Sequence, residues 1–312
     1  MSRLVNLCFS GGRTSAYMTE NILYLQTQGL FLDIKFVITF ANTGREHEET
    51  LKFVNLCDER WRKLYKNIVI WLEAKVFHGA GIHTSFTTTT FKKASREGEP
   101  FEEVVKKYGI PNGNFLHCTR ELKENPIRDL MSAYGGKSGY TKNKVFIPAS
   151  YETWIGIRED EPKRLVGNKN GKQLKRYPLG EFDPLVDDVD LRCDKQDVLD
   201  FWDIMPFNLR IPEHLGNCID CHKKSASKLK KVMRDMGEQV FEFPLKLDTT
   251  YSHISPQIVK GKEIIRKRYR GYQNTSELIT MLKISDFDLK DRDDESGGCS
   301  ESCDPFMEDN KL

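Results

Sequence analysis

The stretch Leu4-Val5-Asn6-Leu7-Cys8-Phe9-Ser10-Gly11-Gly12-Arg13-Thr14-Ser15 decides the fold class. A short apolar run ends at a glycine turn, and residues 14–28 then lack Pro and Gly, which predicts a strand, a tight loop and a helix. Residues 34–40 and 68–72 predict two further strands, separated by an amphipathic helix over 46–66. This alternation predicts an α/β protein with a Rossmann-like parallel sheet, helices on both faces, and ligands at the carboxyl ends of the strands.

The rest of the chain divides into three parts. Residues 78–115 are rich in Thr, Gly and Lys and predict an irregular insertion with one helix near 101–108, followed by a strand over 144–149. Four more helices are expected, over 195–202, 225–236, 256–269 and 276–283. We therefore expect a nucleotide-binding domain over 1–235 with an insertion near 78–140, a helical C-terminal extension over 236–284, and a tail over 285–312.

Composition excludes several classes of protein. With 38% apolar and 30% charged residues, the 312-residue chain is neither mostly disordered, nor collagen-like, nor a coiled coil. The apolar run that ends at Phe9 is too short for a signal peptide, and no run of 18 apolar residues follows. We expect no membrane segment and a cytoplasmic, reducing setting, in which the eight cysteines are thiols, metal ligands or nucleophiles.

Charge is distributed unevenly. The net charge of the chain is +2, but the tail holds ten acidic and three basic residues, so residues 1–284 carry +9. A basic body suits an anionic ligand such as a nucleotide or a nucleic acid. The alternative is an ordinary solvated surface with a solubilising acidic tail.

The glycine turn itself is a candidate phosphate site. It falls between a strand and a helix N-terminus, where backbone N–H groups and the helix dipole attract an anion. Its spacing matches neither the Gly-x-Gly-x-x-Gly pattern nor the Walker pattern, so the common dinucleotide and phosphate-loop enzymes are poorly supported.

Four segments carry a resemblance to a known group of enzymes. Residues 8–15 are similar to a pyrophosphate loop S-G-G-K-D-S, and residues 40–50, F-A-N-T-G-R-E-H-E-E-T, to a D-T-G-x-x-x-x-E-T stretch. Residues 154–161, W-I-G-I-R-E-D-E, resemble G-x-R-x-D-E, and Tyr177-Pro178-Leu179 with residues 194–202 resembles a P-L-x-x-W and D-V-x-x-Y run. These motifs are those of the adenine nucleotide alpha hydrolase (PP-loop) superfamily and its phosphoadenylyl-sulfate (PAPS) reductase-like proteins.

The resemblance covers roughly residues 4–235 and implies a fold of the HUP type. It also implies that ATP and Mg²⁺ are bound by Ser10, Gly11, Gly12, Arg13, Thr14, Ser15, Asn42, Thr43, Gly44 and Arg158. The chain departs from the pattern at Arg13 and Thr14, where the pyrophosphatases usually have Lys and Asp. Arg can still bind phosphate through two hydrogen bonds, but the missing Asp leaves open whether the loop cleaves ATP or only binds an adenine nucleotide.

A cysteine motif lies in the second half of this region. Cys218-Ile219-Asp220-Cys221 is a C-x-x-C, whose two thiolates can bind one metal ion or cluster. A redox pair is the weaker interpretation, because the preceding residues 211–217 show no strand.

Two segments resemble cluster-containing adenylyl-sulfate reductases. Residues 114–126, N-F-L-H-C-T-R-E-L-K-E-N-P, look like their C-C-x-x-R-K-x-x-P segment, and residues 216–223 look like G-C-x-x-C-T-R. The resemblance implies a 4Fe-4S cluster on Cys118, Cys218 and Cys221, with His117 where another cysteine would be. The fourth iron is then bound by His117 or left open for sulfide, as in three-cysteine tRNA thiolation enzymes. The alternatives are a zinc site of these three cysteines with His117 or His222, and purely structural thiols.

The remaining cysteines divide into two groups. Cys299 and Cys303 lie in the acidic tail, and sulfonucleotide reductases use a nucleophilic cysteine on a C-terminal segment. Their acidic neighbours raise a thiol pKa, which favours inert thiols instead. Cys8, Cys57 and Cys193 lie in apolar patterns and are expected to be packing residues.

Basic groups suggest further contacts. Arg158, Lys163 and Arg164 follow an expected strand end and are candidates for binding nucleotide phosphates. Basic residues over 223–231 and 260–270, close to Tyr269 and Tyr272, are candidates for a nucleic-acid backbone. Both sets have the alternative of solvated surface charge.

These features lead to one functional hypothesis and two alternatives. The leading hypothesis is an ATP-dependent PP-loop enzyme with a 4Fe-4S cluster, which adenylates a substrate for sulfur transfer and has an adenine nucleotide, a nucleic-acid substrate and a sulfur donor protein as partners. The first alternative is a sulfonucleotide reductase that uses Cys299 or Cys303. The second is a non-catalytic protein that binds nucleotide or nucleic acid.

Overall fold

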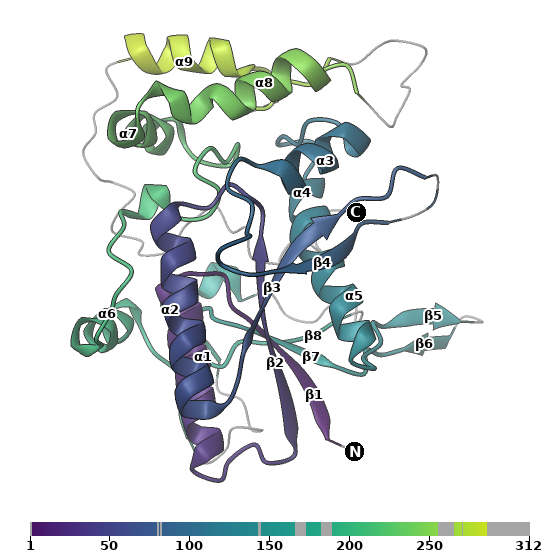
Figure 1. Cartoon of the computed structure of the whole chain (residues 1–312), viewed down its shortest axis with the longest axis vertical. Helices are drawn as coiled ribbons and strands as arrows, with labels where there is room; N and C mark the ends of the chain where they lie inside the picture. Colours follow the sequence, from purple (N-terminus) through teal and green to yellow (C-terminus); the bar gives the residue numbers. More distant parts are fainter. Residues whose placement is uncertain are drawn as a thin grey trace.

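A six-stranded sheet forms the centre of the protein, seen here in a computed structural model that describes residues 2–79, 81, 83–142, 145–165, 173–181, 189–254, 265–269 and 271–285. The strands follow the order β4-β3-β2-β1-β7-β8, and β4 runs antiparallel to its neighbour while the others run parallel (Figure 1). The strands are β1 (Arg3–Cys8), β2 (Ile34–Asn42), β3 (Val69–Lys75), β4 (Ser85–Thr89), β7 (Glu152–Ile155) and β8 (Leu174–Arg176). The predicted α/β architecture with a mostly parallel sheet is therefore confirmed.

Helices cover both faces of the sheet, because alternate residues of each strand point to opposite sides. Val5 and Leu7 of β1 join the core under α1 (Arg13–Thr27), α2 (Glu48–Tyr65) and α6 (Lys195–Ile204). Cys8 joins a second core that includes Ile127 and Met131 of α5 (Asn125–Ala133). α3 (Glu99–Tyr108) lies against β3 on this second side.

The remaining helical elements lie near the carboxyl ends of the strands. A π-helical turn η1 (Arg120–Glu124) connects α4 (His117–Thr119) to α5. Beyond the sheet follow α7 (Ala226–Met236), α8 (Glu242–Tyr251) and α9 (Thr275–Ile284), which Figure 1 shows stacked at the top of the molecule. The 3₁₀ turns among the described residues are η2 (Pro162–Arg164), η4 (Glu213–Leu215) and η5 (Glu238–Phe241). No helix within the described ranges is both long and apolar enough to cross a membrane.

The structure differs from the sequence-based expectation in several elements. The strand expected over 144–149 is β6 (Val145–Ile147), which pairs with β5 (Tyr140–Lys142) in a separate hairpin, while β7 takes the place beside β1. The insertion near 78–140 contains the strand β4, which was not expected. The helix α8 was not expected either, because Pro244 in its first turn masks the helical pattern. Of the helix expected over 256–269, residues 256–264 lie outside the described ranges and 265–269 are not helical.

Candidate functional site

The glycine loop connects β1 to α1. Gly11 has a φ of +82°, and a Cβ at this position would lie 2.9 Å from Thr50 Cγ2, so glycine is required here. The Ser15 hydroxyl accepts a hydrogen bond from the backbone N–H of Ser10 (3.1 Å) and donates one to the carbonyl of Gly12 (3.0 Å). No side chain caps the N-terminus of α1, so the N–H groups of its first turn are available to a bound anion.

This loop lies where the strand order of the sheet reverses. β2 and β3 extend from one side of β1, and β7 and β8 from the other. Open parallel sheets bind their ligands outside the carboxyl ends of the strands at such a switch point. The segment after β7 approaches the loop closely, because a Cβ on Gly156 would lie only 2.8 Å from Ser15 Cα. The fold therefore brings the loops after β1 and β7 together at this edge.

Two arginines add positive charge to this edge. Arg158 is 4% exposed, and its Nη1 donates to Thr14 Oγ1 at 3.1 Å while its Nε donates to Asp160 Oδ1 at 2.8 Å. Burial lowers the pKa of Arg13, although the charge of Glu213 opposes this shift. Both guanidinium groups are partly desolvated, and an anionic ligand between them would offset that cost.

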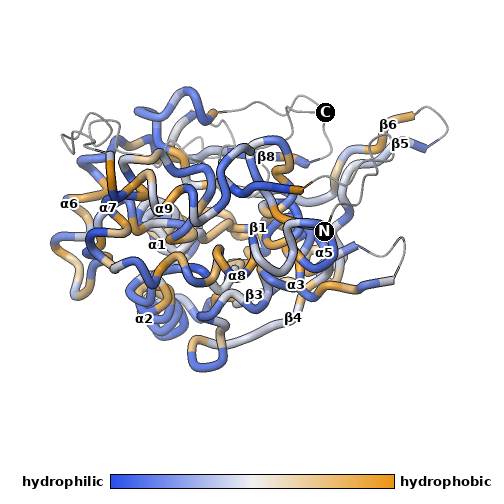
Figure 2. The backbone as a smooth tube through the Cα atoms, turned by 90° about the horizontal axis from the view of Figure 1, so that it is seen from above, coloured by the Kyte–Doolittle hydropathy of each residue, from blue (hydrophilic) through white to orange (hydrophobic). Residues whose placement is uncertain are grey.

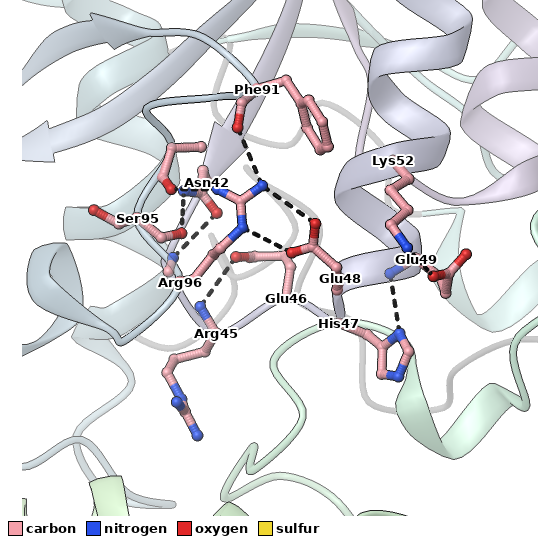
Figure 3. A network of polar contacts seen from close by, with 12 residues as sticks. Asn42, Arg45, Glu46, His47, Glu48, Glu49, Lys52, Phe91, Ser95 and Arg96 are labelled. Atoms are coloured by element: carbon pink, nitrogen blue, oxygen red, sulfur yellow. Dashed lines mark hydrogen bonds and ion pairs between the residues drawn. The ribbon is translucent and has the colours of Figure 1, made fainter.

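The end of β2 is fastened to the segment that follows β4, as Figure 3 shows. The Asn42 amide donates to Glu73 Oε1 (2.7 Å) and to the backbone carbonyl of Ser95 (2.9 Å). The Arg96 guanidinium donates to Glu48 Oε2 (2.7 Å) at the start of α2. Asn42 was predicted to bind nucleotide, but its amide is bonded within the protein, where it holds the turn in place.

The turn after β2 is also bonded internally, and it reaches the cysteine motif. Glu46 accepts hydrogen bonds from the backbone N–H of Thr43 (3.0 Å) and from its hydroxyl (2.8 Å). The backbone N–H of Gly44 donates to Asn42 Oδ1 (3.2 Å). Thr43 Oγ1 lies 3.3 Å from Cys218 Sγ. The predicted nucleotide ligands Thr43 and Gly44 therefore connect the sheet edge to the cysteine motif.

Cys218 and Cys221 form a buried pair. They pack against each other with 7% and 6% exposure, and the backbone N–H of Cys221 donates to the Cys218 carbonyl at 3.1 Å. Burial raises the pKa of Cys218 to about 12, with Glu46 adding to the shift and Lys123 opposing it. Cys218 is therefore held as a neutral thiol at physiological pH, and a bound metal would be needed to stabilise its thiolate.

The other two predicted metal ligands lie in α4. Cys118 is buried among the apolar side chains of a cluster that includes Phe101 and Leu122. His117 Nε2 donates to the carbonyl of Gly109 at 3.1 Å, and burial lowers the pKa of His117 to about 4. In the part of the chain that the structure describes, no group of three or more His, Cys, Asp or Glu side chains is arranged to hold a metal ion. The cluster and the zinc centre therefore stay predictions for these four residues.

Asp220 has no role predicted from the sequence, and His222 is expected only as an alternative zinc ligand. Asp220 is fully buried between the guanidinium groups of Arg45 (3.3 Å) and Arg268 (3.6 Å), which lower its pKa against the effect of burial. His222 is 4% exposed, and its Nε2 has no hydrogen-bond partner among the described residues. Their position inside and next to the C-x-x-C is the sequence signal that could have singled them out.

Several of the basic residues expected to contact a nucleic acid are internal. The carbonyl of His214 accepts a hydrogen bond from Lys224 Nζ at 2.6 Å, and Arg266 donates to the carbonyl of Tyr108 at 2.8 Å. The buried members of the two stretches are Lys224, Lys228, Lys231, Arg266 and Arg268. The charges of these five residues are therefore used inside the C-terminal part. Lys260, Lys262 and Arg270 lie outside the described residues, and contact with a nucleic acid stays a prediction.

The remaining cysteines are placed as follows. Cys8, Cys57 and Cys193 are 4%, 0% and 1% exposed, in agreement with their expected role as packing residues. Burial raises the pKa of Cys193 to about 12. Cys299 and Cys303, the predicted tail nucleophiles, lie outside the described residues.

Comparison with known proteins places this α/β chain in a family. It is 32% identical over 305 residues to the uncharacterized nin region protein ORF290 of Escherichia phage lambda, which covers 96% of this chain and 93% of the phage protein. The chain therefore belongs to the family of this phage protein. It is also 28% identical over 192 residues to the uncharacterized protein MJ0066 of Methanocaldococcus jannaschii, a match that spans 58% of this chain and 30% of the archaeal protein. Neither a protein-family description nor a solved structure matches the chain.

Proposed function

We propose that this protein binds MgATP at the glycine loop and transfers the adenylyl group to a substrate oxygen, as the first step of sulfur transfer. The observation that carries the proposal is the hydrogen bond from Arg158 to Thr14 at the switch point of the sheet. It joins the two segments that the resemblance to PP-loop enzymes assigns to phosphate binding, although they are 144 residues apart in the sequence.

The proposed step is a displacement at the α-phosphorus of ATP. The substrate oxygen forms a bond to this phosphorus, the bond to the bridging oxygen breaks, and pyrophosphate leaves with its magnesium ion. Negative charge then builds up on the leaving pyrophosphate. The N–H groups of the first turn of α1 and the guanidinium groups of Arg13 and Arg158 are the groups of this chain that would stabilise that charge.

The cysteine pair supports the sulfur-transfer part of the proposal. Cys218 contacts Thr43, which follows β2, and β2 is the direct neighbour of the strand that carries the glycine loop. A dithiol at this edge would be close to an activated substrate. We derive no step through a 4Fe-4S cluster or a zinc ion, because among the described residues no group of three or more ligating side chains is arranged to hold a metal ion.

The predicted cluster has its own test. Protein purified without oxygen should contain about four iron and four sulfide per chain and absorb broadly in the visible range, and Cys118→Ala should lower the iron content. Stoichiometric zinc in a colourless protein would contradict the cluster and support the zinc alternative.

The nucleotide site is tested with Arg158→Gln. Charge-assisted hydrogen bonds contribute about 1.5–3 kcal/mol, so the Kd for MgATP should rise roughly 10- to 150-fold, measured by titration calorimetry. Arg192→Gln is the matched control, because Arg192 is half exposed and bonded to Asp190. Equal Kd values for both variants would contradict the site. Pyrophosphate release in the presence of candidate acceptors then separates an adenylating enzyme from a protein that only binds nucleotide.

A further inference from the structure

The hairpin of β5 and β6 projects from the body of the protein. Its two strands pair antiparallel, with Tyr140 opposite Ile147 and Lys142 opposite Val145, and they form a sheet separate from the six-stranded one. Figures 1 and 2 both show it extending sideways, beyond α5. An isolated hairpin of this size is marginally stable in water, so a protein that keeps one exposed usually uses it for contact. We call residues 137–142 and 145–150 the arm.

The arm exposes apolar side chains on both of its faces. Opposite residues in an antiparallel pair share a face, so Tyr140, Val145 and Ile147 lie on one face and Phe146 on the other. Their exposed fractions are 46% for Tyr140, 64% for Val145, 41% for Phe146 and 37% for Ile147. A partner with a single flat surface would cover one face and leave the other in water. A partner that encloses the arm would cover both.

The arm is also strongly basic. Between Met131 and Tyr151 the sequence contains Lys137, Lys142 and Lys144 and no acidic residue. Lys137 and Lys142 are exposed, and neither forms an ion pair with another described residue. Positive charge without acidic neighbours is the electrostatic pattern that binds a polyanion.

We propose that the arm enters the major groove of double-stranded DNA. This groove is about 12 Å wide and admits a two-stranded β-ribbon, with phosphates on its rims for the lysines and base edges, including thymine methyl groups, for apolar side chains. A groove also covers both faces of the ribbon. The major groove of double-stranded RNA is too narrow and deep for such a ribbon, which favours DNA.

This binding site is independent of the proposed nucleotide site. The arm immediately precedes β7, at its amino end, and its base is closed by the hydrogen bond from the backbone N–H of Ser150 to the carbonyl of Lys137 (2.8 Å). The glycine loop lies at the carboxyl ends of the strands. Loss of DNA binding therefore leaves the MgATP proposal intact, and the reverse also holds.

The test measures binding of the full chain to a 30-base-pair DNA duplex by fluorescence anisotropy. The Lys137→Glu/Lys142→Glu variant should bind at least tenfold more weakly than the wild type. The slope of log K against log salt should become less steep by about 2, because each phosphate contact contributes about 0.9. Lys63→Glu/Lys92→Glu makes the same charge change at exposed positions elsewhere and should keep most of the affinity.

Phe146→Ala provides a second measurement. It should weaken duplex binding several-fold and leave the salt slope unchanged, because it removes an apolar contact and no charge. Unchanged duplex affinity in both arm variants would overturn the proposal, as would tighter binding of single-stranded DNA. A dimer in sedimentation velocity that Phe146→Ala dissociates, together with absence of DNA binding, would identify the arm as an interface between two copies of the chain.

Discussion

The glycine loop (residues 10–15) and the cysteine loop (residues 218–221) lie at the same edge of the sheet, but they are held in place differently. In the glycine loop, Ser10, Gly12 and Ser15 bond to one another within six consecutive residues. In the cysteine loop, Asp220 is held by Arg45 and Arg268, which come from distant parts of the sequence. A locally bonded loop can form wherever its strand and helix form. The cysteine loop requires Arg45 and Arg268 to be in place around it.

Buried charge is what distinguishes the cysteine loop. The side chains of Arg268 and Asp220 are 0% exposed, and the guanidinium of Arg45 packs over the Phe243 ring at 4.5 Å. Removing one partner from such a network leaves the other charges buried without compensation. We therefore expect the largest effects of substitution at the cysteine loop and smaller ones at the glycine loop.

The largest effect is expected for Asp220→Ala. It leaves two buried guanidinium groups without their anion, so the free energy of unfolding should fall by about 3–5 kcal/mol in urea denaturation. Asp203→Ala is the control, because Asp203 is 64% exposed and lies 3.9 Å from Arg210, and it should change stability by less than about 0.5 kcal/mol. If Asp220→Ala is as stable as this control, the cysteine loop does not depend on long-range charge.

Acid should weaken the cysteine side of the molecule through His117. Its pKa is about 4 in the folded protein and about 6.5 when unfolded, so the unfolded state binds the proton more readily between these values. The free energy of unfolding should therefore fall as pH drops from about 6.5 to 4, and His117 accounts for about 3 kcal/mol of the loss. Burial also lowers the pKa values of the buried histidines His214 and His222, so both shift stability in the same direction.

His117→Gln tests this pH dependence. Glutamine can still donate to the carbonyl of Gly109 but does not titrate, so the variant should lose less stability on acidification than the wild type. Urea denaturation at a series of pH values between 4 and 7 measures the difference. The exposed His253→Gln should follow the wild type. Parallel curves for His117→Gln and the wild type would contradict the shift at this residue.

The sequence predicted the glycine side better than the cysteine side, and the reason is physical. The order of strand, glycine turn and helix follows from local periodicity, and Gly11 is required by its own backbone conformation. The pairing of Asp220 with Arg268 has no local pattern, since it depends on which buried charges meet after folding. The arm was missed for a related reason, because Val145–Ile147 has the composition of a core strand although the fold leaves it outside.

A moderate effect is expected where the two halves of the nucleotide site touch. Gly156→Ala places a Cβ 2.8 Å from Ser15 Cα, and this backbone contact cannot relax by a side-chain rotation. The change should cost about 1–3 kcal/mol in stability or raise the Kd for MgATP by a similar free energy. Gly113→Ala is the matched control, because nothing lies within 4 Å of its added Cβ. Wild-type stability and affinity in Gly156→Ala would mean that the loops after β1 and β7 are not packed together.

The smallest effect is expected for Ser15→Ala, and it tests whether the glycine loop is held locally. This change removes the acceptor of the Ser10 N–H and the donor to the Gly12 carbonyl, in a side chain that is 4% exposed. Because the net contribution of each such hydrogen bond to stability is modest, the free energy of unfolding should fall by only about 1–2 kcal/mol. Adding Ser10→Ala should cost little more, because the hydroxyl–hydroxyl bond at 3.0 Å is already lost. Adding Asp220→Ala instead should give the sum of the two single losses, because none of the hydrogen bonds and ion pairs described above joins the two loops. A double-mutant cycle in urea measures both pairs. A large coupling between Ser15 and Asp220 would show that the glycine loop, too, depends on the folded C-terminal part.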